Sequence, residues 1–337
     1  MLIEQAYHRV AAGQDLAMED MTELMDAVMQ GQCDELLVGQ LLTALHAKGE
    51  TVEEVAGAAT ALRRHMTPIR SHHASLVDTC GTGGDGSGTF NISTAAALVT
   101  AAAGVPVAKH GNRGITSKSG SADVLAALGV NIEADNSTVE RCLNEVGICF
   151  CFAPLLHPSM KHVAALRRKL GTPTIFNLLG PLCNPASARY QLLGVGREPL
   201  RRRLVDALRV LGTERSAVVR GADGLDEITL SGPTDVSIVR GHAVEHTTWR
   251  PQDFNVREAS LESLTVDGPS QSAAIIVRVL AGEIGPARDI VVVNAAAALW
   301  VAGHATALDE AAGKAATAID DGRAKTVLAR LVQVSHQ

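Results

Sequence analysis

The sequence predicts an α/β protein with a small N-terminal helical bundle domain and a larger α/β domain, whose central, mostly parallel sheet is flanked by helices. In the first 70 residues, apolar side chains recur three and four positions apart, as in amphipathic helices. From about residue 75, short apolar segments alternate with helix-like segments, which favours parallel strands covered by helices. The length of 337 residues suits one large or two unequal domains, and with only 3% aromatic residues, Ala, Val and Leu must build the core.

Composition and charge exclude several classes of protein. The formal net charge of −6 argues against a nucleic-acid or membrane-surface binder, which needs excess Lys and Arg. The cysteines form no Cys-x-x-Cys pair and are typical of buried thiols in a reducing cytoplasm. The first residues lack an apolar signal core, and the longest apolar run, 290–302, is too short for a membrane span. We therefore expect a cytoplasmic protein.

The N-terminal region predicts short helices with recognisable ends. The segment 16–31, "LAMEDMTELMDAVMQG", ends at Gly31, and the segment 34–49 repeats the pattern and ends at Gly49. Thr51 and Glu54 form a capping-box pair before the next helix, beyond which Pro68 follows. Helices joined by such short links favour an antiparallel bundle.

The rest of the chain predicts the α/β domain. Strands are expected at 75–80, 105–110, 130–133, 148–153, 190–196, 216–221 and 235–241. Helices are expected at 91–104, 121–129, 137–147 and 159–172, around 201–203, and at 294–302, the last of them. The division predicted is a small domain of residues 1–70 with a returning helical segment near 160–185, and an α/β domain of residues 75–158 and 188–337.

A glycine-rich loop, "GTGGDGSGTFNIST" at 81–94, lies between a predicted strand and a predicted helix. Its glycines allow sharp turns and close approach of a ligand, and the free N–H groups of residues 91–94 suit a phosphate. A tight turn without a ligand would not need so many glycines and hydroxyls. We therefore predict an anion site here.

Two common phosphate-binding motifs do not account for this loop. Gly81, Gly83 and Gly86 match the dinucleotide fingerprint, but the acidic residue required about 20 positions later is replaced by a cationic stretch beginning at Lys109. No Gly-Lys-Ser/Thr follows the glycines, which excludes a Walker loop.

A second loop, "KHGNRGITSKSGSAD" at 109–123, follows the next predicted strand. It carries Lys109, Arg113 and Lys118, which glycines separate, so they do not form a solvated helical stripe. Ends of adjacent parallel strands face one crevice. Two such loops there fit a ligand with a diphosphate and a further phosphate.

Four blocks together resemble the anthranilate phosphoribosyltransferases: "GTGGDGSGTFNIST" (81–94), "AKHGNRGITSKSGSADVL" (108–125), "TIFNLLGPLCNPA" (174–186) and "GADGLDEIT" (221–229). The resemblance extends from the N-terminal helices to near residue 300. It implies a cytoplasmic homodimer of tryptophan biosynthesis. This glycosyltransferase moves the pentosyl group of 5-phosphoribosyl 1-diphosphate (PRPP) to the amine of anthranilate, with two Mg²⁺ ions per monomer.

The resemblance also implies roles for individual residues. Those for PRPP are Gly81, Gly84, Asp85, Thr89, Asn91, Ile92, Ser93, Thr94, Lys109, His110, Gly111, Asn112, Arg113, Gly114, Ile115, Thr116, Ser117 and Ser121. Those for anthranilate are Gly81, Asn112 and Arg167, and those for magnesium are Ser93, Asp226 and Glu227. Lys109, Asp226 and Glu227 are expected to act in catalysis. Pro173, Arg220 and Gly114 depart from the family's usual residues, which are Arg, His and Ser.

The chemistry of these residues suits such a transfer. Adjacent carboxylates such as Asp226 and Glu227 bind Mg²⁺ together with substrate phosphate, although an acidic surface turn would show the same pair. Arg167 can pair with the carboxylate of anthranilate, whereas without the resemblance an exposed helix arginine is favoured. The aniline amine is already neutral at pH 7, but its proton must leave after attack. His110 is a candidate acceptor, and a structural histidine is an equal alternative.

Two other functions are considered. A pyrimidine nucleoside phosphorylase of the same architecture would carry a Lys-x-Ser-Gly-Arg-type second loop, whose Arg is missing from "KSGSADVL" at 118–125. A non-enzymatic relative that binds nucleic acid would show a basic stripe, which the net acidity opposes. We therefore expect no nucleic-acid or membrane partner, and the sequence does not decide association with a synthase.

Overall fold

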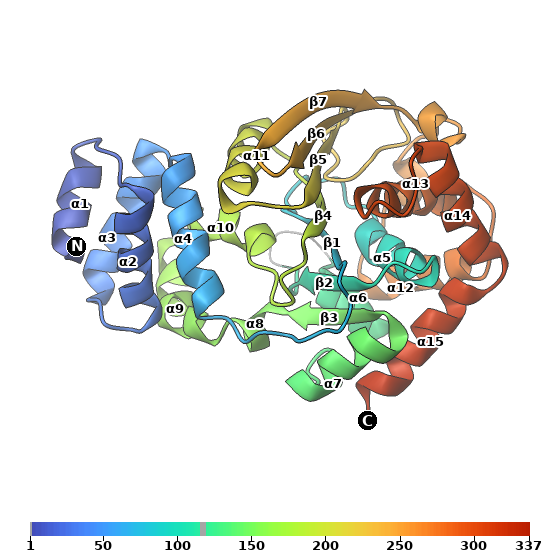
Figure 1. Ribbon diagram of the computed structural model, residues 1–337, viewed down its shortest axis with the longest axis horizontal. Helices are drawn as coiled ribbons and strands as arrows, with labels where there is room; N and C mark the ends of the chain where they lie inside the picture. Colours follow the sequence, from blue (N-terminus) through green and yellow to red (C-terminus); the bar gives the residue numbers. More distant parts are fainter. Residues whose placement is uncertain (1, 115–118) are drawn as a thin grey trace.

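The computed structural model describes residues 2–114 and 119–337. Its N-terminal part is a bundle of helices at one end of the molecule (Figure 1). The helices at 16–31 and 34–49 are confirmed, as is the capping box in which Thr51 and Glu54 each accept from the other's backbone amide. The bundle consists of α1 (Ile3–Ala11), α2 (Met18–Met29), α3 (Glu35–Lys48) and α4 (Val52–Arg64), with α9 (Lys161–Leu170) and α10 (Phe176–Leu179) packed on it.

The second part is built on one seven-stranded sheet in the order β3-β2-β1-β4-β5-β6-β7. The first five strands in this order are parallel. At one edge β6 pairs antiparallel with β5, and β7 pairs antiparallel with β6. The strands are β1 (Val77–Gly81), β2 (Val107–Gly111), β3 (Ile148–Phe152), β4 (Tyr190–Gly194), β5 (Arg215–Gly221), β6 (Thr234–Arg240) and β7 (Ala243–Trp249). The mostly parallel sheet is thus confirmed.

Helices cover both faces of the sheet. On one face lie α5, α13, α14 and α15, and on the other α11 lies between the sheet and α4 (Figure 1). The helices of this part are α5 (Ile92–Ala102), α6 (Ser121–Ala127), α7 (Asn136–Arg141), α8 (Ala153–Leu156), α11 (Glu198–Leu211), α12 (Pro269–Leu280), α13 (Pro286–Val301), α14 (Leu308–Asp320) and α15 (Arg323–Ser335). A single π-turn, Cys142–Val146, continues α7.

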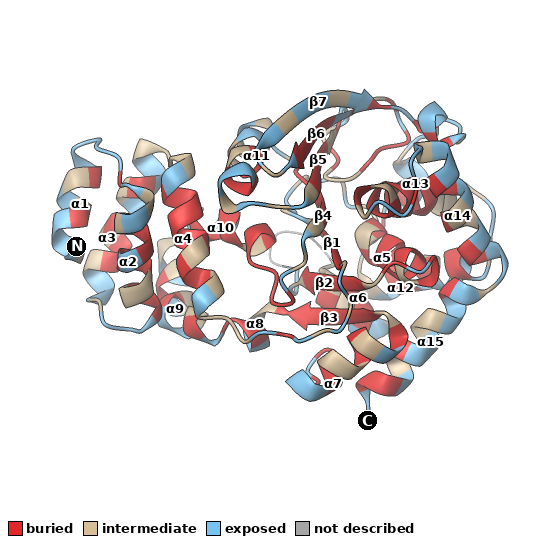
Figure 2. Cartoon of the chain, viewed as in Figure 1, coloured by how far each residue is buried: buried red, intermediate tan, exposed pale blue. Residues whose placement is uncertain are grey.

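Two buried cores lie on the two sides of this sheet. Successive strand residues point to opposite faces, so Leu192 belongs to one core while Leu193 belongs to the other. The second core includes Val218 of β5 and continues through α11 into the helical bundle. The two parts of the chain therefore share buried apolar contacts. Strands β1 to β6 are mostly buried, whereas β7 is largely exposed (Figure 2).

Three expectations from the sequence are wrong. Residues 130–133 form a turn instead of a strand, because the side chain of Asn131 accepts from the amide of Glu133 while Val130 and Ile132 are buried without pairing. Strand β7 follows β6 and was not expected as a separate strand. The helix expected at 294–302 begins earlier, at Pro286, and α14 and α15 follow it.

Within the described part of the chain, no helix combines the length and apolar character required to cross a membrane.

Candidate active site

The two predicted loops lie at the same edge of the sheet. Strands β1 and β2 are parallel neighbours, and they end at Gly81 and Gly111. The loops touch through Asn91 and Ser119, because the Ser119 hydroxyl donates to Asn91 Oδ1 at 2.9 Å. As expected for parallel strands, the crevice at their carboxyl ends gathers segments distant in sequence.

The glycine loop is held in a conformation that needs glycine. Gly83 and Gly84 have φ values of 63° and 72°, in the left-handed region that other residues avoid. The amide of Gly83 donates to Asp226 Oδ2 at 2.8 Å. The loop and the Asp226–Glu227 turn are therefore joined directly.

Three carboxylates gather beside this loop. The Glu227 side chain accepts from the amide of Ser93 at 3.1 Å, and the amide of Asp226 lies 3.4 Å from Asp85 Oδ2. Burial, followed by the neighbouring Asp85, raises the pKa of Asp226 to about 7. Burial and then Asp226 raise the pKa of Glu227 to about 8. Clustered, partly protonated acids of this kind are stabilised by a cation.

These acids fit a hard divalent cation that takes oxygen ligands. Among residues 2–114 and 119–337, no three His, Cys, Asp or Glu side chains are arranged to hold a metal by themselves. Mg²⁺ commonly uses only one or two carboxylates and takes its other ligands from water and substrate phosphate. Asp226, Glu227 and the Ser93 hydroxyl provide such a partial set.

Lys109 lies beneath the same cluster. It is buried, and its ammonium group donates to the carbonyl of Thr79 and to the Ser93 hydroxyl, the latter at 3.3 Å. Burial lowers the pKa of Lys109, while Asp78 and, less strongly, Glu227 oppose that shift. The ammonium group of Lys109 thus lies next to Ser93, whose amide donates to Glu227.

The start of α5 is already engaged by protein groups. The amide of Asn91 donates to Ser272 Oγ at 2.9 Å, and that of Ser93 donates to Glu227. The side chains of Ile92 and Thr94 are buried, so a ligand outside the helix can meet only their backbone. Thr89 and Gly84 lie in the loop before the helix.

The second loop is described in part. Ile115, Thr116, Ser117 and Lys118 lie outside the described residues. Arg113, which is predicted to contact PRPP, pairs with Asp123 at 3.2 Å and Glu133 at 3.4 Å. The amide of Gly114 donates to Asp123, and Ser121 Oγ lies 3.4 Å from the carbonyl of Asn112. Here the loop is organised around Asp123.

Arg167 lies on α9, in the helical bundle. Its guanidinium stands over the ring of Phe176 at 5.3 Å and lies 3.5 Å from Asn177 Oδ1. Its side chain is partly buried, which lowers its pKa, so this arginine is not the exposed helix residue of the alternative interpretation.

His110, which is predicted to contact PRPP, has its side chain inside the protein. It is buried, and its ring contacts the carbonyl of Gly180 and the ring of His157.

Arg220 lies near the acidic cluster, since its Nε contacts the carbonyl of Gly196 at 3.4 Å. A Cβ on Gly196 would lie 2.9 Å from the Cβ of Asp85.

Sequence reasoning missed several residues of this region. Ser272 holds Asn91 from α12, Asn177 lies beside Arg167, and His157 contacts His110. Asn177 lies within the quoted "TIFN" motif, which was a usable signal. Ser272 and His157 belong to no sequence motif that would mark them as site residues.

Comparisons with known proteins agree with this architecture. The glycosyl transferase family α/β domain matches residues 73–325, and the helical bundle domain of the same family matches residues 4–66. An anthranilate phosphoribosyltransferase of Rhodopirellula baltica is 50% identical over 321 residues, covering 95% of this chain and 94% of its own. That of Rhodospirillum rubrum is 52% identical over 325 residues, covering 96% and 93%.

Solved structures show the same relationship. The anthranilate phosphoribosyltransferase of Thermus thermophilus superposes with a TM-score of 0.91 at 40% identity, over 98% of this chain and 99% of that one. The Saccharomyces cerevisiae enzyme in complex with PRPP and Mg gives a TM-score of 0.89 at 28% identity, over 99% and 98%. With the two loops and the acidic pair at one sheet edge, these matches show that the chain belongs to the anthranilate phosphoribosyltransferase family.

Proposed function

We propose that this protein transfers phosphoribose from PRPP to the amine of anthranilate, giving N-(5-phosphoribosyl)anthranilate and diphosphate, as a step of tryptophan biosynthesis. The observation that carries the proposal is the contact chain from Lys109 through Ser93 to Glu227, which puts a cation, a hydroxyl and a carboxylate beside the glycine loop. An activated sugar diphosphate needs this combination, because negative charge develops on its leaving group.

The glycine loop and the second loop would bind PRPP. The proposed contacts are Gly81, Gly84, Asp85, Thr89, Asn91 to Thr94, Lys109 to Ser117, and Ser121. Ile115 to Ser117 lie outside the described residues, and Arg113 would have to leave Asp123 to reach a phosphate. The solved structure of the Saccharomyces cerevisiae relative, which holds PRPP and Mg, supports PRPP as the ligand.

Ser93, Asp226 and Glu227 would hold magnesium, two ions per monomer. Bound there, the metal supplies positive charge that stabilises the departing diphosphate. Lys109 adds a fixed positive charge beside Ser93. The raised pKa values of Asp226 and Glu227 support the metal site, because a divalent cation would offset both the burial and the repulsion that raise them.

Gly81, Asn112 and Arg167 would bind anthranilate. The guanidinium of Arg167 would pair with the substrate carboxylate, since Asn177 and the Phe176 ring already fix its position. The aniline nitrogen, which is neutral at pH 7, would attack C1′ without prior deprotonation. Positioning of the two substrates then supplies much of the rate.

A fluorescence assay of anthranilate consumption, run with and without PRPP, tests the proposed function. Consumption that requires both PRPP and Mg²⁺ supports it. Thymidine phosphorolysis without anthranilate turnover would show a pyrimidine nucleoside phosphorylase instead.

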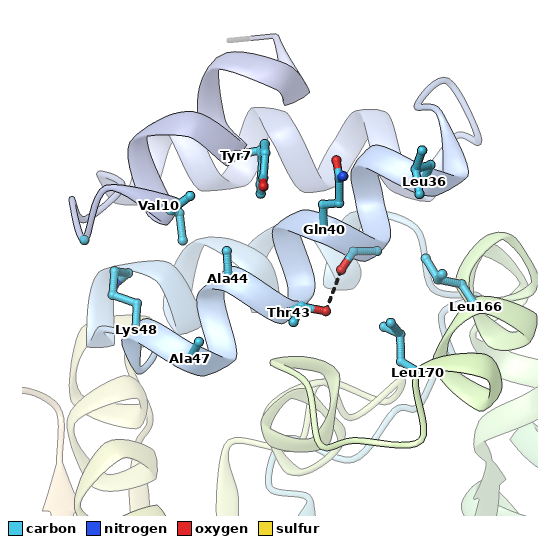
Figure 3. Close-up of a pocket in the computed structure, with 13 residues that line it drawn as sticks. Tyr7, Val10, Leu36, Gln40, Thr43, Ala44, Ala47, Lys48, Leu166 and Leu170 are labelled. Carbon is cyan, nitrogen blue, oxygen red and sulfur yellow. Dashed lines mark hydrogen bonds between the residues drawn. The ribbon is translucent and has the colours of Figure 1, made fainter.

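We also propose that the protein is a homodimer joined through its helical bundle. A groove of about 670 Å³ runs between α1, α3 and α9, and none of its lining residues belongs to the proposed active site (Figure 3). Its walls include Val10, Ala44, Leu166 and Leu170, with Leu36 at its edge exposed to 70%. A second copy seated on this face would cover these side chains and leave the active site free.

We propose that the small helical domain comprises residues 1–70 and the returning segment near 160–185, which carries Arg167. The α/β domain then comprises residues 75–158 and 188–337, which carry the proposed PRPP contacts. We place the protein in the cytoplasm, because all six cysteines are free thiols and a reducing compartment keeps them so.

A further inference from the structure

Two buried histidines form a chain at the carboxyl edge of the sheet. His110 is the penultimate residue of β2, next to Lys109, and His157 follows α8 after the neighbouring strand β3. Their Nε2 atoms lie 3.1 Å apart, and His110 Nδ1 lies 3.0 Å from the carbonyl oxygen of Gly180. Both side chains are almost entirely buried, with residue exposures of 7% and 5%.

The partners determine where the protons lie in the neutral pair. A carbonyl oxygen only accepts, so His110 carries its proton on Nδ1 and donates to Gly180. His110 Nε2 then has a lone pair, and His157 must donate to it from its own Nε2. His157 is consequently left with a lone pair on Nδ1, which is buried without a hydrogen-bond partner among the described residues.

A buried acceptor without a donor is costly, and native structures rarely leave one unless something binds there. Ser159 Oγ and Thr174 Oγ1, from the same stretch of chain, are also buried without partners in the described part of the structure. This stretch contains Arg167, the proposed ligand of the anthranilate carboxylate. Each of these unpaired atoms could form a hydrogen bond with a polar molecule bound on the acceptor side.

We propose that the His110–His157 pair takes the proton that the acceptor amine loses, with His157 Nδ1 as the receiving atom. The inference rests on the proposed function. The lone pair of the amine forms the bond to C1′, and the C1′–O bond breaks with its electrons on diphosphate. One N–H proton of the resulting anilinium passes to His157 Nδ1, and the Nε2 proton of His157 passes to His110 Nε2.

The environment of the pair suits this task. Burial lowers the pKa of His110 to about 4, and burial together with His110 lowers that of His157 to about 3. Both rings are thus neutral and ready to accept at pH 7. A secondary anilinium is itself a strong acid, so a weak base suffices. The proton ends on His110, whose Nδ1–H already donates to Gly180.

The test measures single-turnover rates of anthranilate consumption with saturating PRPP and Mg²⁺. Gln at position 157 can still donate to His110 but cannot accept a proton. We expect His157→Gln to lower the rate about 100-fold, the lower end of the usual effect of a general base. We also expect added imidazole to raise the rate of this variant in proportion to its concentration.

The matched control is His162→Gln on α9, an exposed histidine outside the pair, which should keep the wild-type rate and show no response to imidazole. An unchanged rate in folded His157→Gln would overturn the inference. So would a loss that imidazole does not restore and that a rise in the anthranilate KM fully explains. A wild-type protein that consumes no anthranilate would instead defeat the proposed function.

Spectra of ¹⁵N-labelled histidine in the wild-type protein keep the inference testable if the variant does not fold. At pH 7 we expect neutral rings, with the proton of His110 on Nδ1 and that of His157 on Nε2. A proton on Nδ1 of His157 would remove the receiving atom and overturn the inference.

Discussion

Gly194, at the end of β4, lies directly against the backbone of Asp226: a Cβ at position 194 would come within 1.6 Å of the Asp226 carbonyl oxygen. Only glycine at position 194 leaves room for the backbone of the Asp226–Glu227 turn to lie against β4. We predict that Gly194→Ala displaces the turn and lowers kcat about 100-fold, a usual cost for misplacing catalytic groups by 1 Å. Steady-state kinetics measure the effect, and Gly313→Ala, in open space on α14, should leave kcat unchanged.

Arg167→Ala should raise the KM for anthranilate about 10- to 100-fold, the value of a hydrogen-bonded charge pair. The KM for PRPP should change little, because Arg167 lies on α9 among bundle residues. Arg168→Ala, one position along and exposed, is the matched control. Equal increases in both KM values would contradict the assigned role.

Asp226→Asn combined with Glu227→Gln should weaken the dependence on Mg²⁺ and lower kcat by about 100-fold or more, as loss of charge stabilisation at a leaving group does. A titration of activity against Mg²⁺ concentration measures this change. The control removes the same two charges at exposed positions of β6 and β7, in Asp235→Asn with Glu245→Gln. An unaltered titration curve would remove the acidic pair from the metal site.

The buried histidines predict a loss of stability in acid. Their pKa values in the folded protein lie near 4 and 3, below the ordinary value of 6.5, so the unfolded chain binds more protons between these limits. Stability is therefore unaffected above about pH 6.5 and falls as the pH drops toward 4, by at most about 1.4 kcal/mol per pH unit and histidine.

Urea unfolding between pH 7 and pH 4 measures this dependence. His157→Gln should show a shallower decline, whereas His162→Gln should follow the wild type. A decline of equal slope in all three proteins would assign the acid sensitivity to other groups.

The bundle groove predicts the oligomeric state. Leu36→Glu places a charge where a second copy would cover an apolar side chain, and it should weaken the dimer at least about 10-fold. Sedimentation velocity at several concentrations measures the dissociation constant. Val277→Glu, at an exposed apolar position on α12 outside the groove, should leave the dimer intact. A monomeric wild type would contradict the proposed interface.

Local signals predicted much of the fold. The Thr51–Glu54 capping box and Gly49 fixed helix ends that depend only on neighbouring residues. The short apolar segment 130–133 was misassigned, because Val130 and Ile132 are buried by tertiary packing and not by strand pairing. Strand β7 is largely exposed at the sheet edge, so it lacks the apolar pattern that indicates a strand.

Prediction of the site residues depended more on the resemblance to the anthranilate phosphoribosyltransferases than on local sequence signals. Gly83 and Asp226 are 143 positions apart, and nothing local to either predicts their hydrogen bond. The pairing of Arg113 with Asp123 likewise could not be predicted from the sequence, since a loop arginine near glycines is equally suited to bind phosphate. The contact of His157 with His110 was not predicted, because no sequence motif distinguishes His157 from the other histidines.

The core that runs from the bundle through α11 to Val218 and Val239 also limits how this chain can be divided. Cutting after residue 70 would strip apolar cover from α11, whose buried side includes Leu204 and Leu208. Neither fragment would then fold as a stable unit by itself, and separately expressed halves should aggregate. The bundle is thus a structural necessity for the rest of the enzyme.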